Sequence, residues 1–303
     1  MIASTHSIPA AGGRPSHRAP VGACDCHFHV FDARFPAFAG AALKSADALV
    51  PDYLRLRDRL GIARGVIVTP STYGTDNACT LDAMAKLGET VRGVAVVDSS
   101  VSQAELHRLG RLGIRGFRVN LLRPGTATLD MIEPLARRVA DLGWHVQLQI
   151  AADDIVRHAP ALSRLPVPLV FDHMGRIPLP QGMRHPAFDI IRGLLDAGNA
   201  WMKISGFYLE SRVGPPSYDD LAQLARTFIG TAPERVVWGS DWPHPSVGAV
   251  NAVDDARLFD IAAEWAGTEA TWVKMMTHNP EALYDFPKDS RLSPREPLRG
   301  SSE

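Results

Sequence analysis

The sequence lacks any apolar run approaching the ~20 residues that a membrane-spanning helix requires, so no membrane partner is expected. It also lacks a charge excess: 32 Lys and Arg face 33 Asp and Glu, for a formal net charge of −1. Without a basic excess to neutralise phosphates, nucleic acid is not an expected partner. Only three cysteines occur, and the first 20 residues contain no apolar secretory core. These absences predict a cytoplasmic protein.

No G-x-G-x-x-G motif follows the first apolar run, which weakens the case for a dinucleotide-binding open sheet. The chain does contain eight short runs rich in Val and Ile, at 23–30, 64–69, 92–97, 115–120, 145–150, 168–173, 200–205 and 236–241. Leucines at helical spacing separate several of them, at 51–60, 103–112 and 132–142. Eight strand–helix units predict a single-domain α/β fold, a (β/α)8 TIM barrel, with a doubly wound sheet as the alternative.

The predicted barrel spans residues 22–286. Residues 1–21 are expected to be a flexible N-terminal arm, and residues 287–303 a polar C-terminal tail.

Two histidines stand two residues apart at the end of the first run. Because side chains alternate along a strand, His27 and His29 share one face, which we expect to be the inside of the barrel. By the same alternation Cys24, Cys26 and Phe28 should face the helices. A pair of hydrogen-bonded core histidines is the alternative, but adjacent imidazoles at a strand end favour a functional role.

Two further runs end in residues that carry chemistry. His173 closes the sixth run, with Arg176 in the loop beyond it, and Asp241 closes the eighth. Barrel enzymes build their sites at the carboxyl ends of the strands, so these groups should converge if the barrel closes. A loop-capping carboxylate is the alternative for Asp241, and a solvated charge is the alternative for Arg176.

Polar residues also alternate along the fourth and fifth runs. Arg118 and Gln149 are expected to face the barrel interior, whereas His145 comes too early in its strand to reach the mouth. Together, Arg118, Arg123 and Arg176 could form a clamp for carboxylates, since each charge-assisted hydrogen bond contributes about 1.5–3 kcal/mol.

These features resemble the amidohydrolase superfamily and, more narrowly, its 2-pyrone-4,6-dicarboxylate lactonase group. The resemblance runs from about residue 22 to residue 284. The segments that carry it are the H-x-H at 27–29, GTDN and TLD at 74–77 and 80–82, GVAVVD at 93–98, FDHMGR at 171–176 and WGSDWPHP at 238–245.

The resemblance implies hydrolysis of a small anionic lactone. Asp241 corresponds to the general base that activates water, and His27, His29 and His173 to imidazoles around the scissile carbonyl. Substrate contacts are expected from Arg118, Arg123, Arg176, Ser71, Gln149 and His244, the last lying in a loop stiffened by two flanking prolines.

Three positions depart from the lactonase pattern. Ser45 and Gln149 stand where the lactonase group has tyrosines, and Leu209 replaces a substrate-binding arginine. A rebuilt carboxylate subsite is therefore expected, with Ser205, Tyr208 and Arg212 as substitute contacts. The lactone of a sugar acid or of another ring-cleavage product fits as well as the pyrone dicarboxylate.

The same residues leave other functions open. His27, His29, His173 and Asp241 also satisfy a mononuclear zinc site, as in a zinc-dependent amidohydrolase-type hydrolase or decarboxylase. The usual strand-4 lysine and strand-5 histidine are missing, so we expect that no metal or other cofactor is required. A lactone isomerase and a non-catalytic binding barrel are the remaining alternatives, and a homo-oligomer stays open.

Overall fold

Eight parallel strands form a barrel in the computed structural model, which describes residues 13–43, 45–122, 128–247 and 253–288. Each strand pairs with the next, in the order β1 to β8. The ring closes where the peptide N–H of Asp241 donates to the carbonyl of His27 (2.7 Å). The predicted barrel is confirmed, with its strands at β1 (Cys24–Phe28), β2 (Arg64–Val68), β3 (Val91–Ala95), β4 (Ile114–Asn120), β5 (His145–Gln149), β6 (Leu169–Phe171), β7 (Ala200–Ile204) and β8 (Val236–Trp238).

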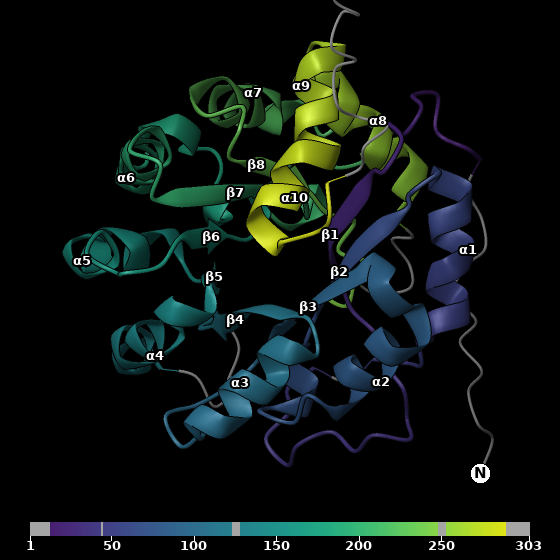
Figure 1. Ribbon diagram of the computed structural model, residues 1–303. Coiled ribbons are helices and arrows are strands. Elements are labelled where there is room, and N and C mark those ends of the chain that lie inside the picture. The colour runs from purple at the N-terminus through teal and green to yellow at the C-terminus, as the bar shows by residue number, and fades with distance from the viewer. Residues whose placement is uncertain (1–12, 44, 123–127, 248–252, 289–303) are drawn as a thin grey trace, which may run out of the picture.

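Helices surround the barrel in the connections between strands (Figure 1). They are α1 (Val50–Leu60), α2 (Ala78–Leu87), α3 (Gln103–Arg111), α4 (Ile132–Val139), α5 (Ala152–Leu162), α6 (Pro186–Asp196), α7 (Ala222–Thr231), α8 (Asp255–Ala266), α9 (Glu269–Val273) and α10 (Asn279–Tyr284). The three helices predicted from leucine spacing are α1, α3 and α4. In α1, Pro51 occupies the first turn and Gly61 ends the helix with φ 74°, as helix-capping chemistry favours.

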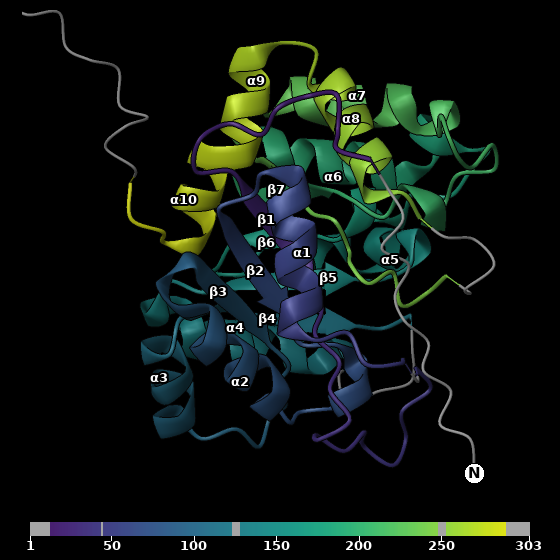
Figure 2. The same cartoon turned by 90° about the vertical axis from the view of Figure 1, so that its right-hand side faces the viewer.

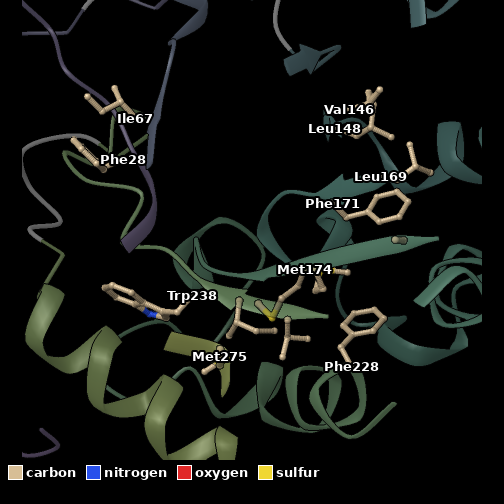
Figure 3. Packing of buried hydrophobic residues seen from close by; sticks show 14 of the residues in the cluster. Phe28, Ile67, Val146, Leu148, Leu169, Phe171, Met174, Phe228, Trp238 and Met275 are labelled. Atoms are coloured by element: carbon tan, nitrogen blue, oxygen red, sulfur yellow. The ribbon is translucent and has the colours of Figure 1, made fainter. Parts of the chain in front are cut away.

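Apolar side chains form two layers. The larger layer fills the space between the sheet and the helices, and Figure 3 shows part of it, including Phe171 and Trp238. The smaller layer lies inside the barrel and contains Val170 from β6. Tyr284 and Phe286, at and just beyond the end of α10, close this inner layer at the amino ends of the strands. The carboxyl ends are therefore the end of the barrel that is left for a site.

The prediction that Cys24 and Cys26 face the helices is wrong, because both belong to the inner layer. Between Asp25 and Phe28, β1 contains one more residue than the paired stretch of β2. Such a register shift interrupts the alternation of side chains. Asp25 therefore points out of the barrel, towards the hydroxyl of Tyr53 in α1 (3.2 Å). The outward orientation expected for Phe28 is confirmed, since its ring stacks on that of Tyr53.

Part of the predicted N-terminal arm lies against the barrel's outer helices (Figure 2). The peptide N–H groups of Ser16 and His17 donate to the carboxylate of Asp260 in α8 (2.9 and 2.8 Å). The indole of Trp272 in α9 donates to the carbonyl of Arg18 (3.3 Å). No helix among the described residues combines the length and apolar character needed to cross a bilayer.

Candidate active site

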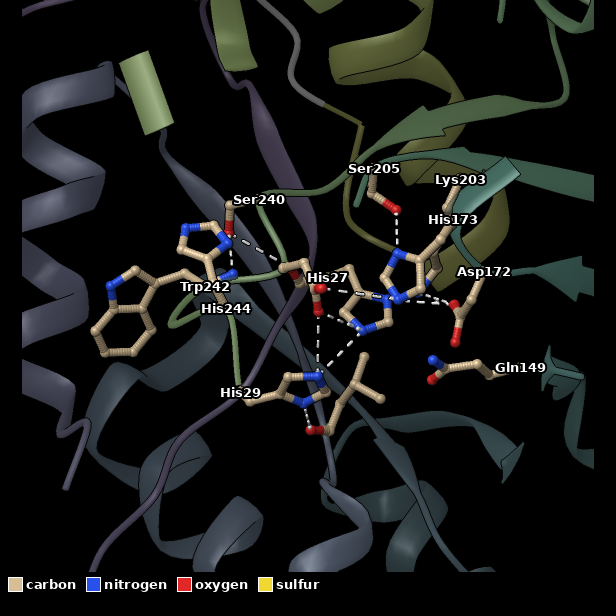
Figure 4. Close-up of polar contacts among 12 residues, drawn as sticks. His27, His29, Gln149, Asp172, His173, Lys203, Ser205, Ser240, Trp242 and His244 are labelled. Carbon is tan, nitrogen blue, oxygen red and sulfur yellow. Dashed lines mark hydrogen bonds and ion pairs between the residues drawn. The ribbon is translucent and has the colours of Figure 1, made fainter. Parts of the chain in front are cut away.

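Four side chains from three strand ends meet at the carboxyl end of the barrel. His27 and His29 come from the end of β1, His173 follows β6 and Asp241 follows β8. The Nε2 atoms of His27 and His29 lie 3.5 and 3.4 Å from Oδ1 of Asp241, and Nε2 of His173 lies 3.9 Å from its Oδ2. Figure 4 shows the three imidazoles turned towards one another. The structure thus brings together the four residues that the sequence predicted to converge.

Local backbone geometry directs two of these residues inward. His173 and Asp241 have left-handed conformations, with φ 50° and 59°. Such residues typically cost about 1–3 kcal/mol each and concentrate at functional sites. Two glycines leave room for the rings: a Cβ at Gly206 would lie 2.7 Å from Nδ1 of His173, and one at Gly239 would lie 2.5 Å from Cβ of His27.

In His29 and His173, the ring nitrogen that points away from Asp241 contacts another group of the protein. Nδ1 of His29 lies 2.7 Å from the carbonyl of Val68, which can only accept, so this nitrogen carries a proton. Nδ1 of His173 lies 2.9 Å from Oγ of Ser205. These contacts fix the planes of both rings (Figure 4). Ser205 thus contacts a site histidine, and its expected contact with substrate stays a prediction.

A small cavity, partly open to solvent, lies above these groups. Its lining includes His29, His173 and Asp241, together with Arg118, Gln149 and Ser71, and is completed by Leu43, Pro70, Asn120, Pro245 and Ser246. Arg118 is almost fully buried, and its guanidinium donates to Gln149 and, through Nε, to Asp172 (3.0 Å). The cavity therefore combines a carboxylate, imidazoles, a cation and neutral polar groups.

The predicted arginine clamp is only partly visible. Arg118 lines the cavity, whereas the guanidinium of Arg176 is paired with the carboxylate of Glu210 at 2.6 Å. Arg123 lies outside the described residues. Among the described residues, Arg118 is thus the cation that faces the cavity, and the role of the other two arginines stays a prediction.

His244 is buried, and both of its ring nitrogens contact the protein. Nε2 lies 2.9 Å from Oδ1 of Asp255 in α8, and Nδ1 lies 3.2 Å from the hydroxyl of Tyr208. That hydroxyl donates to Oδ2 of Asp241 (2.5 Å). A chain of hydrogen bonds thus connects α8 with the site carboxylate. His244 and Tyr208, both expected to touch substrate, occupy this chain.

Two buried charged residues beneath His27 were missed by the sequence analysis. Lys203 of β7 donates from Nζ to Oε1 of Gln147 (2.7 Å) and to the carbonyl of Cys26 (2.9 Å), and lies 3.3 Å from Nδ1 of His27. Asp172 lies beside both, with Oδ1 3.2 Å from the same Nδ1 and 3.7 Å from Nζ of Lys203.

The sequence did contain a signal for both residues. Lys203 is charged in the middle of an apolar strand, with the same parity as Ser205, and Asp172 directly precedes His173. A charge inside a strand that is predicted to be buried needs a partner of opposite sign.

Burial sets the protonation states of the site. It lowers the pKa of His173 to about 4 and the pKa of His27 well below 6.5, with the charge of Lys203 adding to the effect on His27. Burial also opposes ionisation of Asp241, but the surrounding imidazoles, His173 foremost, hold the pKa of its carboxyl well below 3.8. Near neutral pH, Asp241 is therefore an anion beside neutral His27 and His173.

The charges below the site balance one another. Burial lowers the pKa of Lys203 to about 8, leaving it largely protonated at pH 7, and nearby Asp172 limits the fall. Burial opposes ionisation of Asp172 as well, but its interactions with His27, Arg118 and Lys203 keep its pKa well below 3.8. Two buried cations, Arg118 and Lys203, thus face two buried carboxylates, Asp172 and Asp241.

Some of these side chains have the composition of a metal site. One potential ligand atom from each of His27, His173 and Asp241 falls within 4.8 Å of the others. His29, the fourth residue of the predicted set, lies beside them, with its Nε2 3.3 Å from that of His27. Donor type and spacing therefore suit zinc. To act as a ligand, however, His27 must present an unprotonated ring nitrogen to the metal, and its hydrogen bonds decide which nitrogen carries the proton.

Comparison with known proteins places this site in a family. Residues 24–286 match the family model described as Amidohydrolase. The chain is 34% identical to a 2-pyrone-4,6-dicarboxylate hydrolase of Comamonas testosteroni, over 89% of this chain and 92% of that protein. It is 33% identical to a D-galactarolactone isomerase of Agrobacterium fabrum, over 90% and 94%. A crystal structure of an Agrobacterium tumefaciens protein superposes with a TM-score of 0.87 at 32% identity, covering 92% of this chain and 99% of that one.

Proposed function

Because the chain belongs to the amidohydrolase family, we propose that it hydrolyses the ester bond of a small anionic lactone. The observation that carries the proposal is the placement of the Asp241 carboxylate among three imidazoles at the carboxyl end of the barrel. The two relatives named above, a hydrolase and an isomerase, are each named for a lactone substrate, which supports the substrate class.

In the proposed reaction Asp241 accepts a proton from water while the water oxygen bonds to the lactone carbonyl carbon. Imidazole N–H groups stabilise the oxyanion that forms. When the ring C–O bond breaks, Asp241 returns the proton to the departing oxygen, and the products are a carboxylic acid and an alcohol. Near neutral pH the new acid ionises, so each turnover releases one proton to solution.

The cavity lining supports an anionic substrate with additional polar groups. Arg118 offers positive charge, and a charge-assisted hydrogen bond to a carboxylate contributes about 1.5–3 kcal/mol. Ser71, Asn120 and Gln149 offer neutral donors and acceptors for hydroxyl groups. This lining suits a hydroxylated acid lactone at least as well as a planar dicarboxylate.

We propose that the reaction needs no metal, since Asp241 itself serves as the base. Were zinc to bind, His27, His29, His173 and Asp241 would hold it, and it would polarise the carbonyl and acidify water. Activity that disappears on chelation and returns with zinc would contradict the metal-independent mechanism.

Isomerisation is the second candidate, because one relative is a lactone isomerase. Transfer of the acyl group to a hydroxyl of the substrate needs the same carbonyl activation, but it incorporates no water and releases no proton. Turnover in ¹⁸O-labelled water separates the two: hydrolysis leaves one ¹⁸O in the product carboxylate, and isomerisation leaves none.

The direct test is Asp241→Asn, assayed by proton release across lactones that carry one or two carboxylates. We expect kcat to fall by about 10²–10⁴-fold, the usual contribution of a positioned general base. Circular dichroism should stay unchanged, because the amide keeps the shape of the carboxylate. Asp189→Asn, on the exposed face of α6, is the matched control and should retain full activity. Near-normal turnover by the Asp241→Asn variant would remove Asp241 from its role as base.

A further inference from the structure

The ammonium of Lys203 lies fully buried beneath the site, and its hydrogen bonds can be counted completely. A lysine ammonium has three N–H donors and no acceptor. Nζ has three acceptors within hydrogen-bond distance: Oε1 of Gln147 at 2.7 Å, the carbonyl of Cys26 at 2.9 Å and Nδ1 of His27 at 3.3 Å. Oδ1 of Asp172 forms an ion pair with Nζ at 3.7 Å, beyond hydrogen-bond distance. Three donors therefore match three acceptors, provided that Nδ1 of His27 presents a lone pair.

Asp172 supplies independent support for this assignment. Its Oδ1 lies 3.2 Å from Nδ1 of His27, close enough for a hydrogen bond, and 3.7 Å from Nζ of Lys203. Yet Oδ1 has no hydrogen-bond partner among the described residues, whereas Oδ2 accepts from Arg118 and Gln147. The ring of His27 is thus oriented for its Nδ1 to accept from Lys203 rather than to donate to Asp172.

The other end of the ring completes the count. A neutral imidazole with a lone pair on Nδ1 carries its proton on Nε2. Nε2 of His27 lies 3.5 Å from Oδ1 of Asp241, a carboxylate oxygen that can only accept, so a proton on Nε2 has an acceptor in the site. In this arrangement Nδ1 of His27 accepts from Lys203, and Nε2 of His27 has an acceptor for its proton.

We propose that Lys203 is a positioning residue that holds His27 as its Nε2–H tautomer, so that His27 acts as a hydrogen-bond donor in the site and not as a metal ligand. A metal ligand must present a lone pair, and the only nitrogen of His27 that faces Asp241 and His173 keeps its proton. His27, His173 and Asp241 therefore have the spacing of a zinc site, but the proton on Nε2 of His27 leaves that nitrogen without a lone pair for the metal. The inference relies on the proposed function only for the catalytic task of His27.

The tautomer can be read from the wild-type protein without substrate. Long-range ¹H–¹⁵N correlation spectra of ¹⁵N-histidine-labelled protein distinguish a protonated from an unprotonated ring nitrogen. The signals of His27 are identified by their loss in His27→Gln. We expect Nε2 to be protonated and Nδ1 to be unprotonated. A proton on Nδ1 of His27 in the wild-type protein would overturn the proposal.

Zinc affinity gives a second measurement. In Lys203→Met, Nδ1 is free to take the proton and donate it to Oδ1 of Asp172, leaving a lone pair on Nε2. We expect this variant to bind zinc at least about 10-fold tighter than wild type in competition with a chelating dye, the lower range of effects reported for partners of ligating histidines. Gln147→Met keeps the ammonium on His27 and should bind zinc as wild type does. Equal zinc affinity of Lys203→Met and wild type would contradict the proposal.

Activity separates this proposal from the proposed function. Lys203→Met should lower kcat by about 10²-fold with little change in KM, the usual effect of losing one oxyanion donor. If no lactone is opened by the wild-type enzyme, the spectra and the zinc titration still decide the tautomer. If the wild-type enzyme opens lactones but Nδ1 of His27 is protonated, the proposed role of Lys203 is wrong and the proposed function stands. Should Lys203→Met not fold, the wild-type spectra remain decisive.

Discussion

Replacing His145 by leucine should stabilise the protein, and more strongly at acid pH. His145 is the first residue of β5, and its side chain lies inside the barrel at the amino end, edge-on to the ring of Tyr284 (5.4 Å between centroids). It is buried, and neither ring nitrogen has a hydrogen-bond partner among the described residues. An unpaired buried polar group typically costs about 1–3 kcal/mol, which an apolar side chain of similar size avoids.

The pH dependence follows from the pKa of the imidazole. Burial lowers the pKa of His145 to about 3, and the charge of Lys203 adds to the effect. In the unfolded chain the pKa is about 6.5. Between these values the unfolded state binds the proton and the folded state does not, so the free energy of unfolding falls as the pH drops below 6.5. At pH 5 this penalty is about 2 kcal/mol, whereas at pH 7 it is only about 0.2 kcal/mol.

Urea denaturation of wild type and His145→Leu at pH 7 and pH 5 measures both effects. At pH 7 we expect the variant to lie between equal stability and about 2 kcal/mol more stable, because imperfect packing of leucine offsets part of the gain. At pH 5 its advantage should grow by about 2 kcal/mol. Lactone turnover should not change, since His145 lies at the end of the barrel opposite the cavity. An advantage that is the same at both pH values would refute the reasoning.

Two substitutions around the cavity test how the base and its neighbours are held. Tyr208→Phe removes the hydroxyl that donates to Asp241, so the pKa of Asp241, which lies well below 3.8 in the wild type, should rise. The acid limb of the profile of kcat/KM against pH, measured to below pH 4, should then move to higher pH, and an unmoved limb would contradict this contact. Gly206→Ala places a methyl group 2.7 Å from Nδ1 of His173, at a residue whose φ is 61°. The displaced imidazole should lower kcat by about 10²-fold. Gly193→Ala is the control and should leave kcat unchanged, because a Cβ there meets nothing within 4 Å.

The strands and the four converging residues were predictable because one rule governs them all. Carboxyl ends of parallel strands meet at one end of a barrel, so His173 and Asp241 could be placed beside His27 without any knowledge of loops. The orientation of Cys24 and Cys26 was not predictable, since the extra residue in β1 depends on how that strand pairs with its neighbour. Loop contacts escaped for a similar reason: the partner of Arg176 is 34 residues away along the chain.

The buried charged residues beneath the site were not predicted from the sequence, because each is stable in the barrel interior only when the others are present. Asp172, Lys203 and Arg118 are costly in the barrel interior when taken singly, yet near neutral pH they form, with Asp241, a set of two cations and two anions. A substrate carboxylate beside Arg118 adds one negative charge to this set. As the water attacks, a proton moves to Asp241 and the negative charge moves from its carboxylate to the substrate oxyanion, so the net charge of the site does not change. The transition state is therefore favoured over the bound substrate only by groups that stabilise the oxyanion more strongly than the carboxylate of Asp241, and the N–H groups of the surrounding imidazoles are placed for this role.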